Sequence, residues 1–397
     1  MHFLSDKKVI IVEKPHIVFR RWYDKKLKGI VYTGDNQAEI RDFPVPKPEG
    51  RQVLVKVKAT TICGSDMRKW RASKEELLKR FTQEQMESFW FNLIQGHEGA
   101  GVVEEVGPAV DFLKKGDRVM MVHSQGCGVC RNCIEGNPRL CTTIDSYAPA
   151  MPSRNGEHRM GEWLQATNVN GTFAEYILNR NEHSVRKMNP FLSFIDGAIL
   201  GCGGGTAFES LRKTDVNART KMAVYGLGPV GLCDVLIAKA LGAYVIGVDI
   251  REERVKLGEK FGCDAVINSK EEDPVKRIME LTNNEGVNVA IEASGFAFMP
   301  AVHSVINNRG VVCVTGLGSD SQNVPGFNTG MLMFPGEKGV WGSSLFPLQS
   351  THELMDLLTQ HKVHLDQIVD TTYKLSQAQE AHEQFESYKS GKIGFLL

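Results

Sequence analysis

The segment that decides the fold begins with Met222-Ala-Val-Tyr225 and continues as Gly226-Leu-Gly228-Pro-Val-Gly231. The first run is apolar and predicts a buried strand, and residues 232–241 have helical spacing. The first glycine permits a tight turn, the second lets the backbone approach a pyrophosphate, and the third lets the helix pack against the strand. The pyrophosphate would then lie at the helix N-terminus. The residues expected to contact a dinucleotide here are Gly226, Leu227, Gly228, Pro229, Val230 and Gly231.

A second apolar run, residues 244–248, is followed by Asp249. This acid lies about 20 residues beyond the glycines, where a carboxylate accepts hydrogen bonds from the adenosine ribose. The glycines alone also fit a turn without a ligand, but strand, helix, second strand and acid in this order favour dinucleotide binding. Asp249 would repel a 2′-phosphate, so NAD is expected rather than NADP. Arg251 and Arg254 keep NADP open, and Arg254 is counted among the cofactor-binding residues.

Strands and helices continue to alternate after Asp249, which predicts a parallel, doubly wound α/β sheet with ligands at the carboxyl ends of its strands. Thr315 and Gly316 follow a strand and are therefore expected at the cofactor. The predicted helices span residues 251–261 and 273–283, and the predicted strands span residues 265–267, 287–291 and 311–314.

Composition limits the classes of function. The chain has 397 residues, of which 42% are hydrophobic, and is long enough for two domains. Its 47 basic residues balance 47 acidic ones, so no net field attracts nucleic acid or an anionic membrane. We expect neither a transmembrane helix nor a secretory signal. The nine cysteines then suggest metal ligands and free thiols in a cytoplasmic protein.

The region before the glycine motif has the pattern of an antiparallel β domain. Residues 53–59 alternate between valine or alanine on one face and lysine on the other. Residues 1–27 are expected to form an arm across the body, and residues 147–170 to form a loop. The segment between Asp66 and Gly96 predicts a helix with Leu78, Phe81, Met86, Phe89 and Trp90 on its apolar face. A helical tail from His352 should pack back onto this N-terminal domain.

Three short motifs in and after this β domain carry metal-binding side chains. Cys63 alone would be interpreted as a small buried hydrophobe, but His97 and Cys202 also lie in glycine-flanked motifs. Two thiolates and one imidazole suit a catalytic zinc whose fourth position stays open for water or substrate. Asp66 is expected to accept the ring N–H of His97, and Glu98 to approach the metal when water leaves.

Four cysteines are spaced C-x₂-C-x₂-C-x₇-C. Such close pairs suit a tetrahedral zinc with four sulfur ligands and no open position, which makes the site structural. An iron–sulfur cluster or unliganded thiols are the alternatives, and disulfides are disfavoured in a cytoplasmic chain. The lobe spans about residues 123–145, and its ligands are Cys127, Cys130, Cys133 and Cys141.

Together these motifs resemble the zinc-dependent medium-chain dehydrogenases, the alcohol and polyol dehydrogenase family, from about Lys28 to the C-terminus. The resemblance implies that Cys63, His97 and Cys202 hold a catalytic zinc. It further implies that Ser65 relays the proton of the alcohol and that Thr206 contacts the nicotinamide. Arg68 stands where many members have a proton-relay histidine.

The resemblance also implies the fold and the reaction. A GroES-like catalytic domain would comprise residues 1–203 and 343–397, and a Rossmann NAD-binding domain residues 204–342. We expect reversible hydride transfer between NAD and a secondary alcohol, polyol or sugar, in a homo-oligomer such as a dimer or tetramer. The alternatives are a zinc-free quinone or enoyl reductase of the same fold and a non-enzymatic protein that binds NAD and zinc.

Overall fold

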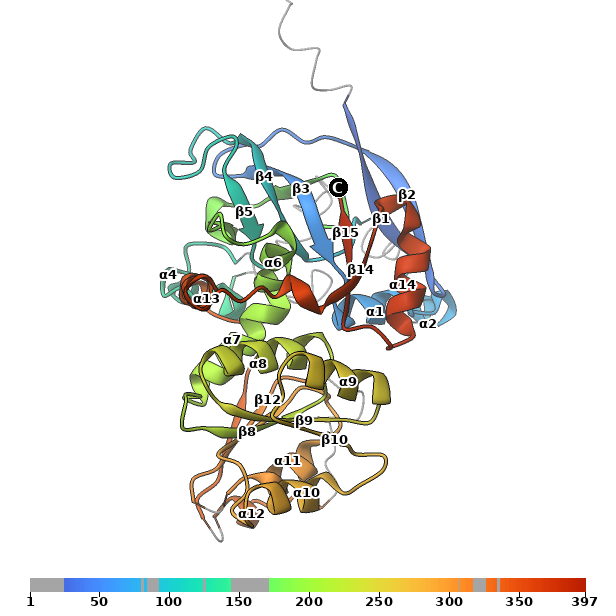
Figure 1. The fold of residues 1–397 in the computed structure, drawn as a ribbon. Coiled ribbons are helices and arrows are strands. Elements are labelled where there is room, and N and C mark those ends of the chain that lie inside the picture. The colour runs from blue at the N-terminus through green and yellow to red at the C-terminus, as the bar shows by residue number, and fades with distance from the viewer. Residues whose placement is uncertain are drawn as a thin grey trace, which may run out of the picture.

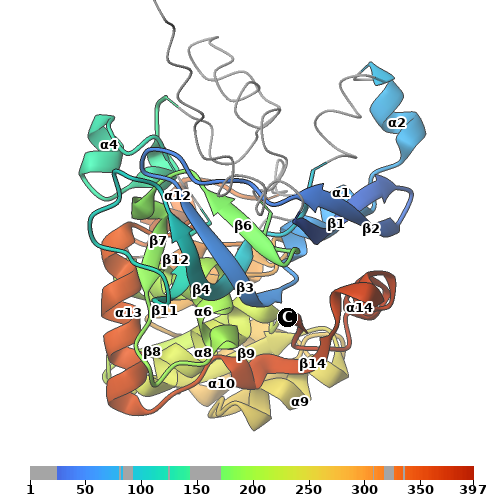
Figure 2. The same ribbon diagram turned by 90° about the horizontal axis from the view of Figure 1, so that it is seen from above.

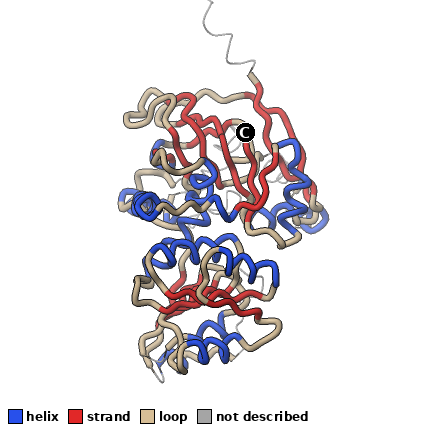
Figure 3. Tube along the Cα trace, viewed as in Figure 1, coloured by secondary structure: helices blue, strands red, loops and turns tan. Residues whose placement is uncertain are grey.

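The computed structural model describes residues 25–79, 82–83, 93–123, 126–143, 171–306, 308–316, 326–333 and 336–397. This part of the chain is built around two large sheets (Figure 1). Figure 3 shows helices packed on both faces of the lower sheet, whereas the upper part of the molecule is rich in strands. No helix within these residues is both long and apolar enough to cross a membrane.

The lower sheet has six parallel strands in the order β10-β9-β8-β11-β12-β13. Helices α8 and α9 cover one face, and α10 and α11 lie on the other (Figure 1). The chain moves outward from β8 to β10 and then returns to place β11 beside β8. This reversal is a switch point, where doubly wound sheets bind ligands. The strands are β8 (Lys221–Tyr225), β9 (Tyr244–Asp249), β10 (Ala265–Asn268), β11 (Val289–Glu292), β12 (Val311–Val314) and β13 (Gly339–Gly342).

The first three helices of this region agree with the predicted ranges within a few residues, whereas the last two were not predicted. In chain order, the helices are α8 (Pro229–Ala240), α9 (Glu252–Lys260), α10 (Pro274–Leu281), α11 (Phe298–Ser304) and α12 (Gly330–Met333). The first of them begins inside the glycine motif, at Pro229, because proline at the first helical position loses no hydrogen bond that the helix would have made. The predicted parallel α/β sheet is confirmed.

The upper sheet has the order β14-β15-β3-β4-β5-β7, with β6 also paired to β3. Its pairs are antiparallel except for β14 and β15. Its strands are β3 (Val53–Thr61), β4 (Glu98–Val106), β5 (Arg118–Met121), β6 (Tyr176–Asn179), β7 (Val185–Lys187), β14 (Val369–Tyr373) and β15 (Lys392–Leu396). A separate hairpin consists of β1 (Lys26–Gly34) and β2 (Gln37–Pro44). Short helices connect these strands: α4 (Arg131–Ile134), η2 (Pro138–Leu140) and η3 (Glu182–Ser184).

The C-terminal tail differs from its prediction as a helical segment. It contains α13 (Leu348–His361) and α14 (Ala378–Glu386), the short helices η5 (Asp366–Ile368) and η6 (Leu375–Gln377), and also β14 and β15. Strand β15 pairs with β3, so the tail does return to the N-terminal part as expected. The pattern Lys392-Ile-Gly-Phe-Leu396 lacks alternation because four of its five residues are buried, and this hid the strand from a search for period two.

The segment after Cys63 forms α1 (Gly64–Trp70) and α2 (Lys74–Leu78), which lie with the β1–β2 hairpin at one side of the molecule (Figure 2). The predicted apolar face was wrong at Leu78, which is exposed, whereas Leu77 is buried. The other members of that face, Phe81, Met86, Phe89 and Trp90, lie outside the described residues. The same holds for the loop predicted over 147–170 and for nearly all of the arm predicted over 1–27.

A composite helix connects the two sheets. It begins as α6 (Phe194–Ile199), widens into a π-helical segment η4 (Leu200–Gly204), and continues as α7 (Gly205–Lys213). Glycine is needed in the widened turn, because a Cβ at Gly201 would lie 2.2 Å from the Met121 carbonyl oxygen. One hydrophobic core runs from β4 and β5 through this helix into β8 and α8. The helix is therefore fixed on both sides, and π-turns of this kind often occur at functional sites.

Candidate active site

Three segments that are far apart in the sequence meet beside the composite helix. Cys63 follows β3, His97 precedes β4, and Cys202 lies in the π-helical turn. The antiparallel pairing of β3 with β4 places Thr61 opposite Glu98 and so brings the first two segments together. The potential ligand atoms of Cys63, His97, Glu98 and Cys202 all lie within 4.8 Å of one another.

The His97 ring is oriented by Asp66. Its Nδ1 lies 3.0 Å from Asp66 Oδ1, and the other carboxylate oxygen of Asp66 accepts the backbone N–H of Cys63 at 2.9 Å. His97 Nε2 is buried and has no hydrogen-bond partner among the described residues. Burial works to lower the pKa of His97, but the charge of Asp66 outweighs it and raises that pKa, so a metal at Nε2 would replace the ring proton there. The buried Nε2, flanked by two thiols, is what a Cys₂His zinc site requires.

The two thiols of the cluster share a hydrogen bond. This bond lowers the pKa of Cys63 well below the usual range, and the charges of His97 and Lys392 act in the same direction. It raises the pKa of Cys202, whose thiol keeps its own proton and donates toward the Cys63 sulfur. Cys63 is therefore the more readily ionised ligand, and a metal ion would favour ionisation of both.

Glu98 is paired with a lysine that the sequence pattern did not reveal. Its Oε2 lies 2.7 Å from Lys392 Nζ and accepts a hydrogen bond from Thr61. Burial works to lower the pKa of Lys392, but the charges of Glu98 and Cys63 outweigh it and raise that pKa. Glu98 Oε1 is buried and has no hydrogen-bond partner among the described residues. The carboxylate is thus held at one oxygen, and the other oxygen remains available beside the cysteines. The only signal for Lys392 was a charged residue in the apolar run Lys392-Ile-Gly-Phe-Leu396.

A second histidine, also missed from the sequence, lies against His97. The ring centroids of His123 and His97 are 4.3 Å apart in an edge-to-face arrangement. The backbone N–H of His123 donates to the Gly201 carbonyl oxygen, which fixes it beside the π-helical turn. Burial and the charge of His97 lower the pKa of His123 to about 3, so its imidazole is neutral near pH 7. Ser65 and Arg68 occupy exposed positions on α1.

The glycine motif forms the turn between β8 and α8. Gly226 has φ +96°, a conformation that other residues rarely adopt. A Cβ at Gly231 would lie 1.9 Å from the Gly226 carbonyl oxygen, so the helix can approach the strand only with glycine there. A Cβ at Gly228 would lie 2.9 Å from a guanidinium nitrogen of Arg254. Pro229 and Val230 form the first turn of α8. The N-terminus of α8 and a cation therefore lie together, as phosphate binding requires.

Asp249 ends β9 beside this turn. Its two carboxylate oxygens accept the backbone N–H groups of Leu227 at 2.8 Å and of Arg251 at 3.0 Å. The Arg254 guanidinium donates to the Tyr388 carbonyl oxygen. Both arginines also lie over the Tyr388 ring, with guanidinium-to-centroid distances of 4.7 Å for Arg251 and 5.8 Å for Arg254. The acid is thus ordered by the glycine turn itself, and the two arginines stack on the C-terminal segment.

The remaining residues predicted at the cofactor lie at the same edge of the sheet. Thr315 and Gly316 follow β12, and their backbone N–H groups both donate to the Glu292 carbonyl oxygen at the end of β11. Thr206 is buried at the start of α7 and donates to the Cys202 carbonyl oxygen at 2.8 Å. The composite helix therefore places Thr206 one turn beyond Cys202, between the metal-binding cluster and the sheet edge.

The four-cysteine lobe forms a second cluster. The sulfur atoms of Cys127, Cys130, Cys133 and Cys141 lie within 4.8 Å of one another. The backbone N–H of Cys130 donates to Cys127 Sγ at 3.2 Å. Burial works to raise the pKa of Cys130, but backbone N–H groups of Thr142 and Cys133 outweigh it and lower that pKa to about 6. All four side chains offer only sulfur, so the donor set suits a tetrahedral metal without an open position.

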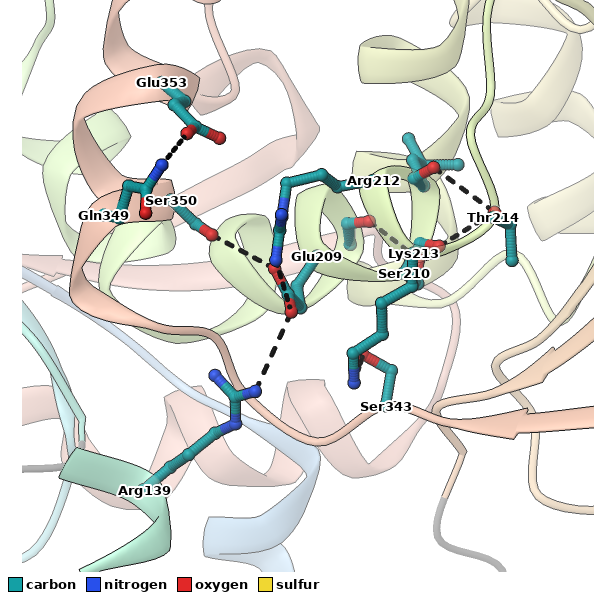
Figure 4. A network of polar contacts seen from close by, with 12 residues as sticks. Arg139, Glu209, Ser210, Arg212, Lys213, Thr214, Ser343, Gln349, Ser350 and Glu353 are labelled. Carbon is teal, nitrogen blue, oxygen red and sulfur yellow. Dashed lines mark hydrogen bonds and ion pairs between the residues drawn. The ribbon is translucent and has the colours of Figure 1, made fainter. Parts of the chain in front are cut away.

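A buried carboxylate connects this lobe to the composite helix (Figure 4). Glu209 of α7 lies 3.7 Å from Arg139 of the lobe and 2.9 Å from Arg212. It also accepts the hydroxyl of Ser350 on α13 at 3.1 Å. Only 1% of the Glu209 side chain is exposed, and 10% of Arg139, so the contact is largely shielded from water. The lobe is therefore attached to the helix that carries Cys202 and Thr206.

Comparison with known proteins identifies relatives of this chain. The family description "Alcohol dehydrogenase GroES-like domain" matches residues 49–189, and "Zinc-binding dehydrogenase" matches residues 229–360. An uncharacterized zinc-type alcohol dehydrogenase-like protein of Escherichia coli is 32% identical over 93% of this chain and 98% of its own length. An NAD-dependent alcohol dehydrogenase of Sulfurisphaera tokodaii is 31% identical over 89% of this chain and 94% of its own.

Solved structures agree with these matches. The crystal structure of benzyl alcohol dehydrogenase from Acinetobacter calcoaceticus superposes with a TM-score of 0.77 at 28% sequence identity. The superposition covers 94% of this chain and 99% of the other. The predicted GroES-like and α/β architecture is thus confirmed along nearly the whole length.

Proposed function

We propose, from the premise that this chain belongs to the zinc-dependent medium-chain alcohol dehydrogenase family, that it transfers a hydride reversibly between an alcohol and NAD. The observation that carries the proposal is the buried, unpartnered His97 Nε2 between the thiols of Cys63 and Cys202. A zinc-free reductase has no use for this arrangement. The substrate we propose is a secondary alcohol, a polyol or a sugar.

The catalytic metal ligands in this proposal are Cys63, His97 and Cys202. A bound zinc ion supplies Lewis-acid chemistry, which lowers the pKa of an alcohol and polarises a carbonyl group. Asp66 keeps His97 in the tautomer that binds metal, through the 3.0 Å contact with Nδ1. Glu98, held at one oxygen by Lys392, serves as an alternate ligand through its free Oε1.

The cofactor in this proposal lies along the carboxyl edge of the parallel sheet. The N-terminus of α8 and Arg254 bind the pyrophosphate, and Asp249 accepts hydrogen bonds from the ribose. Thr315 and Gly316 lie at this edge and Thr206 lies on α7, and all three would position the nicotinamide half. Bound at these residues, NAD would supply the acceptor for the hydride of the carbinol carbon. The Asp249 charge, which would repel a 2′-phosphate, supports NAD over NADP.

The proton of the alcohol leaves through Ser65 in this proposal. Ser65 lies at an exposed position at the start of α1, two residues after Cys63, so its hydroxyl can exchange a proton with solvent. Arg68, one turn further on, is exposed as well, and its guanidinium group offers hydrogen-bond donors but no acceptor. It cannot take up a proton as a histidine would, so Ser65 passes the proton to water.

The four-cysteine lobe holds a structural zinc in this proposal, which makes two zinc ions per chain. The all-sulfur donor set supports it, since four thiolates leave no position for a substrate. The domain division we propose is a catalytic domain of residues 1–203 and 343–397 with an NAD-binding domain of residues 204–342. Iron instead of zinc in the lobe would be seen as visible absorbance of the purified protein.

The test is an NADH-absorbance screen over primary alcohols, secondary alcohols, polyols, sugars and amino alcohols. We expect NAD reduction with at least one secondary alcohol or polyol, and loss of that activity after chelation. Activity that survives complete removal of metal would favour the zinc-free reductase. NAD binding without turnover of any alcohol would favour a non-enzymatic binding protein.

A further inference from the structure

The charges around the metal-binding cluster are unequally paired. Both carboxylates have a partner, because Asp66 contacts His97 and Glu98 contacts Lys392. Lys69 does not: within the part of the chain that the structure describes, its ammonium group has no hydrogen bond and no ion pair. One positive charge near the cluster is therefore left without a counterion in direct contact.

Lys69 lies on the side of α1 that faces the cluster. It follows Asp66 by three residues, and side chains at this spacing are neighbours on one helix face. Asp66 contacts His97, so this face is the one turned toward the metal ligands. This spacing makes Lys69 a neighbour of Asp66 on the helix face that carries the contact with His97.

The surroundings of this lysine are poor in water. Lys69 is half-buried, and burial lowers its pKa although the Asp66 charge opposes the effect. An ammonium group removed from water without a counterion costs free energy, and an anion placed against it recovers that cost. A site that keeps such a charge next to a catalytic metal is suited to an anionic ligand.

The cofactor does not account for this charge. The phosphate-binding turn has its own cation, because the Arg254 guanidinium lies beside Gly228 at the N-terminus of α8. Helix α1 packs against β1 of the hairpin. The two cations thus serve different places, Arg254 at the dinucleotide and Lys69 at the metal-binding cluster.

We propose that the substrate is an alcohol that carries a carboxylate or a phosphate group, and that Lys69 binds this anionic group. The inference rests on the proposed function, since it assigns a substrate class to the same site. Asp66 and Glu98 do not oppose the anion strongly, because each is already paired.

The test uses triplets of substrates on the zinc-loaded enzyme with NAD. Each triplet contains a polyol, the acid with one terminal carboxylate and the monophosphate ester of the same polyol, so that the carboxylate and the phosphate are separate arms. We expect one anionic member to exceed the neutral polyol in kcat/KM by about 10- to 100-fold, the effect of one charged hydrogen bond. A preference for the neutral member in every triplet would overturn the proposal.

Variants identify the residue. Lys69→Met should remove the preference by raising KM for the anionic member, with less than about threefold effect on the neutral one. Lys69→Arg should retain it, which guards against a general loss of folding. Lys79→Met is the matched control, because Lys79 is exposed and, where the structure describes its surroundings, pairs with Glu75. Equal losses on charged and neutral substrates in Lys69→Met would mean that the lysine only balances the charge of the site, and would overturn the proposal.

A binding measurement separates this proposal from the proposed function. The tertiary alcohol 2-hydroxy-2-methylpropanoate has no carbinol hydrogen, so it binds without hydride transfer, and tert-butanol is its neutral counterpart. Calorimetry should show tighter binding of the acid to the parent, and no such difference in Lys69→Met. That result without turnover of any alcohol would leave the anion site standing and remove the dehydrogenase function. Turnover without any anion preference would do the reverse.

Discussion

The two cysteine clusters differ in how their side chains are brought together and satisfied. The lobe takes four sulfurs from one short stretch, Cys127 to Cys141, and backbone N–H groups donate to them. The other cluster takes Cys63, His97 and Cys202 from three distant segments, and two buried polar atoms there, His97 Nε2 and Glu98 Oε1, have no hydrogen-bond partner within the described part of the chain. Four sulfur donors with hydrogen-bonded backbone N–H groups suit a structural metal site. A mixed donor set with unpartnered polar atoms suits a catalytic site, where substrate and water exchange.

The largest effect expected from this difference is in catalysis. Cys63→Ser should lower kcat by at least about 1,000-fold, because Lewis-acid stabilisation is worth several kcal/mol and each 1.4 kcal/mol is tenfold. NAD affinity and the melting temperature should change little, since each sheet also has a hydrophobic cluster that does not include Cys63. Steady-state kinetics and calorimetry measure both. The control is Cys263→Ser, a half-buried thiol away from either cluster; near-normal turnover in Cys63→Ser would contradict the role given to that cluster.

The opposite pattern is expected in the lobe. Cys130→Ser should lower stability by several kcal/mol, because metal-binding free energy is folding free energy in a lobe with little core of its own. Thermal unfolding and solubility report the loss, and kcat per folded molecule should fall much less than in Cys63→Ser. If Cys130→Ser unfolds at the parent temperature, the lobe does not hold a structural metal.

Asp234 provides a comparison with His97 and Glu98, because it also has an unpartnered buried atom among the described residues but lies outside both metal-binding clusters. Asp234 Oδ2 is buried on α8 without a partner among the described residues, and burial raises the pKa of Asp234 to about 8. The folded state therefore holds a proton that the unfolded state has lost between about pH 4 and pH 8, so stability falls as pH rises through this window.

Asp234→Asn cannot ionise and should be more stable than the parent by several kcal/mol at pH 8 but much less so at pH 5. Urea unfolding at the two pH values checks this. Added zinc should not change the stability difference between Asp234→Asn and the parent, because Asp234 is not a metal ligand in this account. A difference that is independent of pH would mean that Asp234 ionises in the folded protein as it does in water.

The contact between the lobe and the composite helix should be worth less. Arg139→Met removes one partner of the buried Glu209, and the penalty should be about 1–3 kcal/mol because Arg212 and Ser350 remain. Urea unfolding of Arg139→Met, Glu209→Gln and the double variant gives the coupling energy. Additive losses would show that the two residues do not interact and that the lobe is energetically separate from the catalytic helix.

Cofactor choice is the smallest effect. Measured kcat/KM should favour NAD over NADP by at least about 10-fold, which corresponds to about 1.4 kcal/mol. Asp249→Ser should reduce the preference for NAD over NADP. The substitution removes the carboxylate that would repel a 2′-phosphate, and it leaves the backbone N–H groups of Leu227 and Arg251 without that negative charge. A parent preference for NADP would instead assign Arg251 or Arg254 to a 2′-phosphate.

Local patterns made the parallel sheet and the four-cysteine lobe predictable. Each strand and helix after Gly226 has its own periodicity, and the lobe cysteines are close in sequence. The Cys63, His97 and Cys202 cluster came from the resemblance rather than from spacing, because pairing of β3 with β4 is what brings these segments together. No periodicity of the sequence records such a pairing.

The same reason explains what was missed. Lys392 reaches Glu98 because β15, near the C-terminal end of the chain, pairs with β3, near its N-terminal end. His123 lies outside any motif and is placed by its backbone bond to the Gly201 carbonyl. From the sequence alone, Lys69 is indistinguishable from the other charged residues of its helix. Its lack of a counterion among the described residues is visible only in the three-dimensional structure.

The most direct test of a metal at Cys63, His97 and Cys202 is zinc content measured together with alcohol-dependent NAD reduction during stepwise chelation. Protein purified without added metal should contain about two zinc ions per chain, and the first to leave should be the one at the mixed cluster, whose coordination is open. Turnover should fall in proportion to that first ion, return when one zinc is restored, and leave NAD affinity unchanged throughout. Full turnover in protein with no zinc at this cluster would contradict the account.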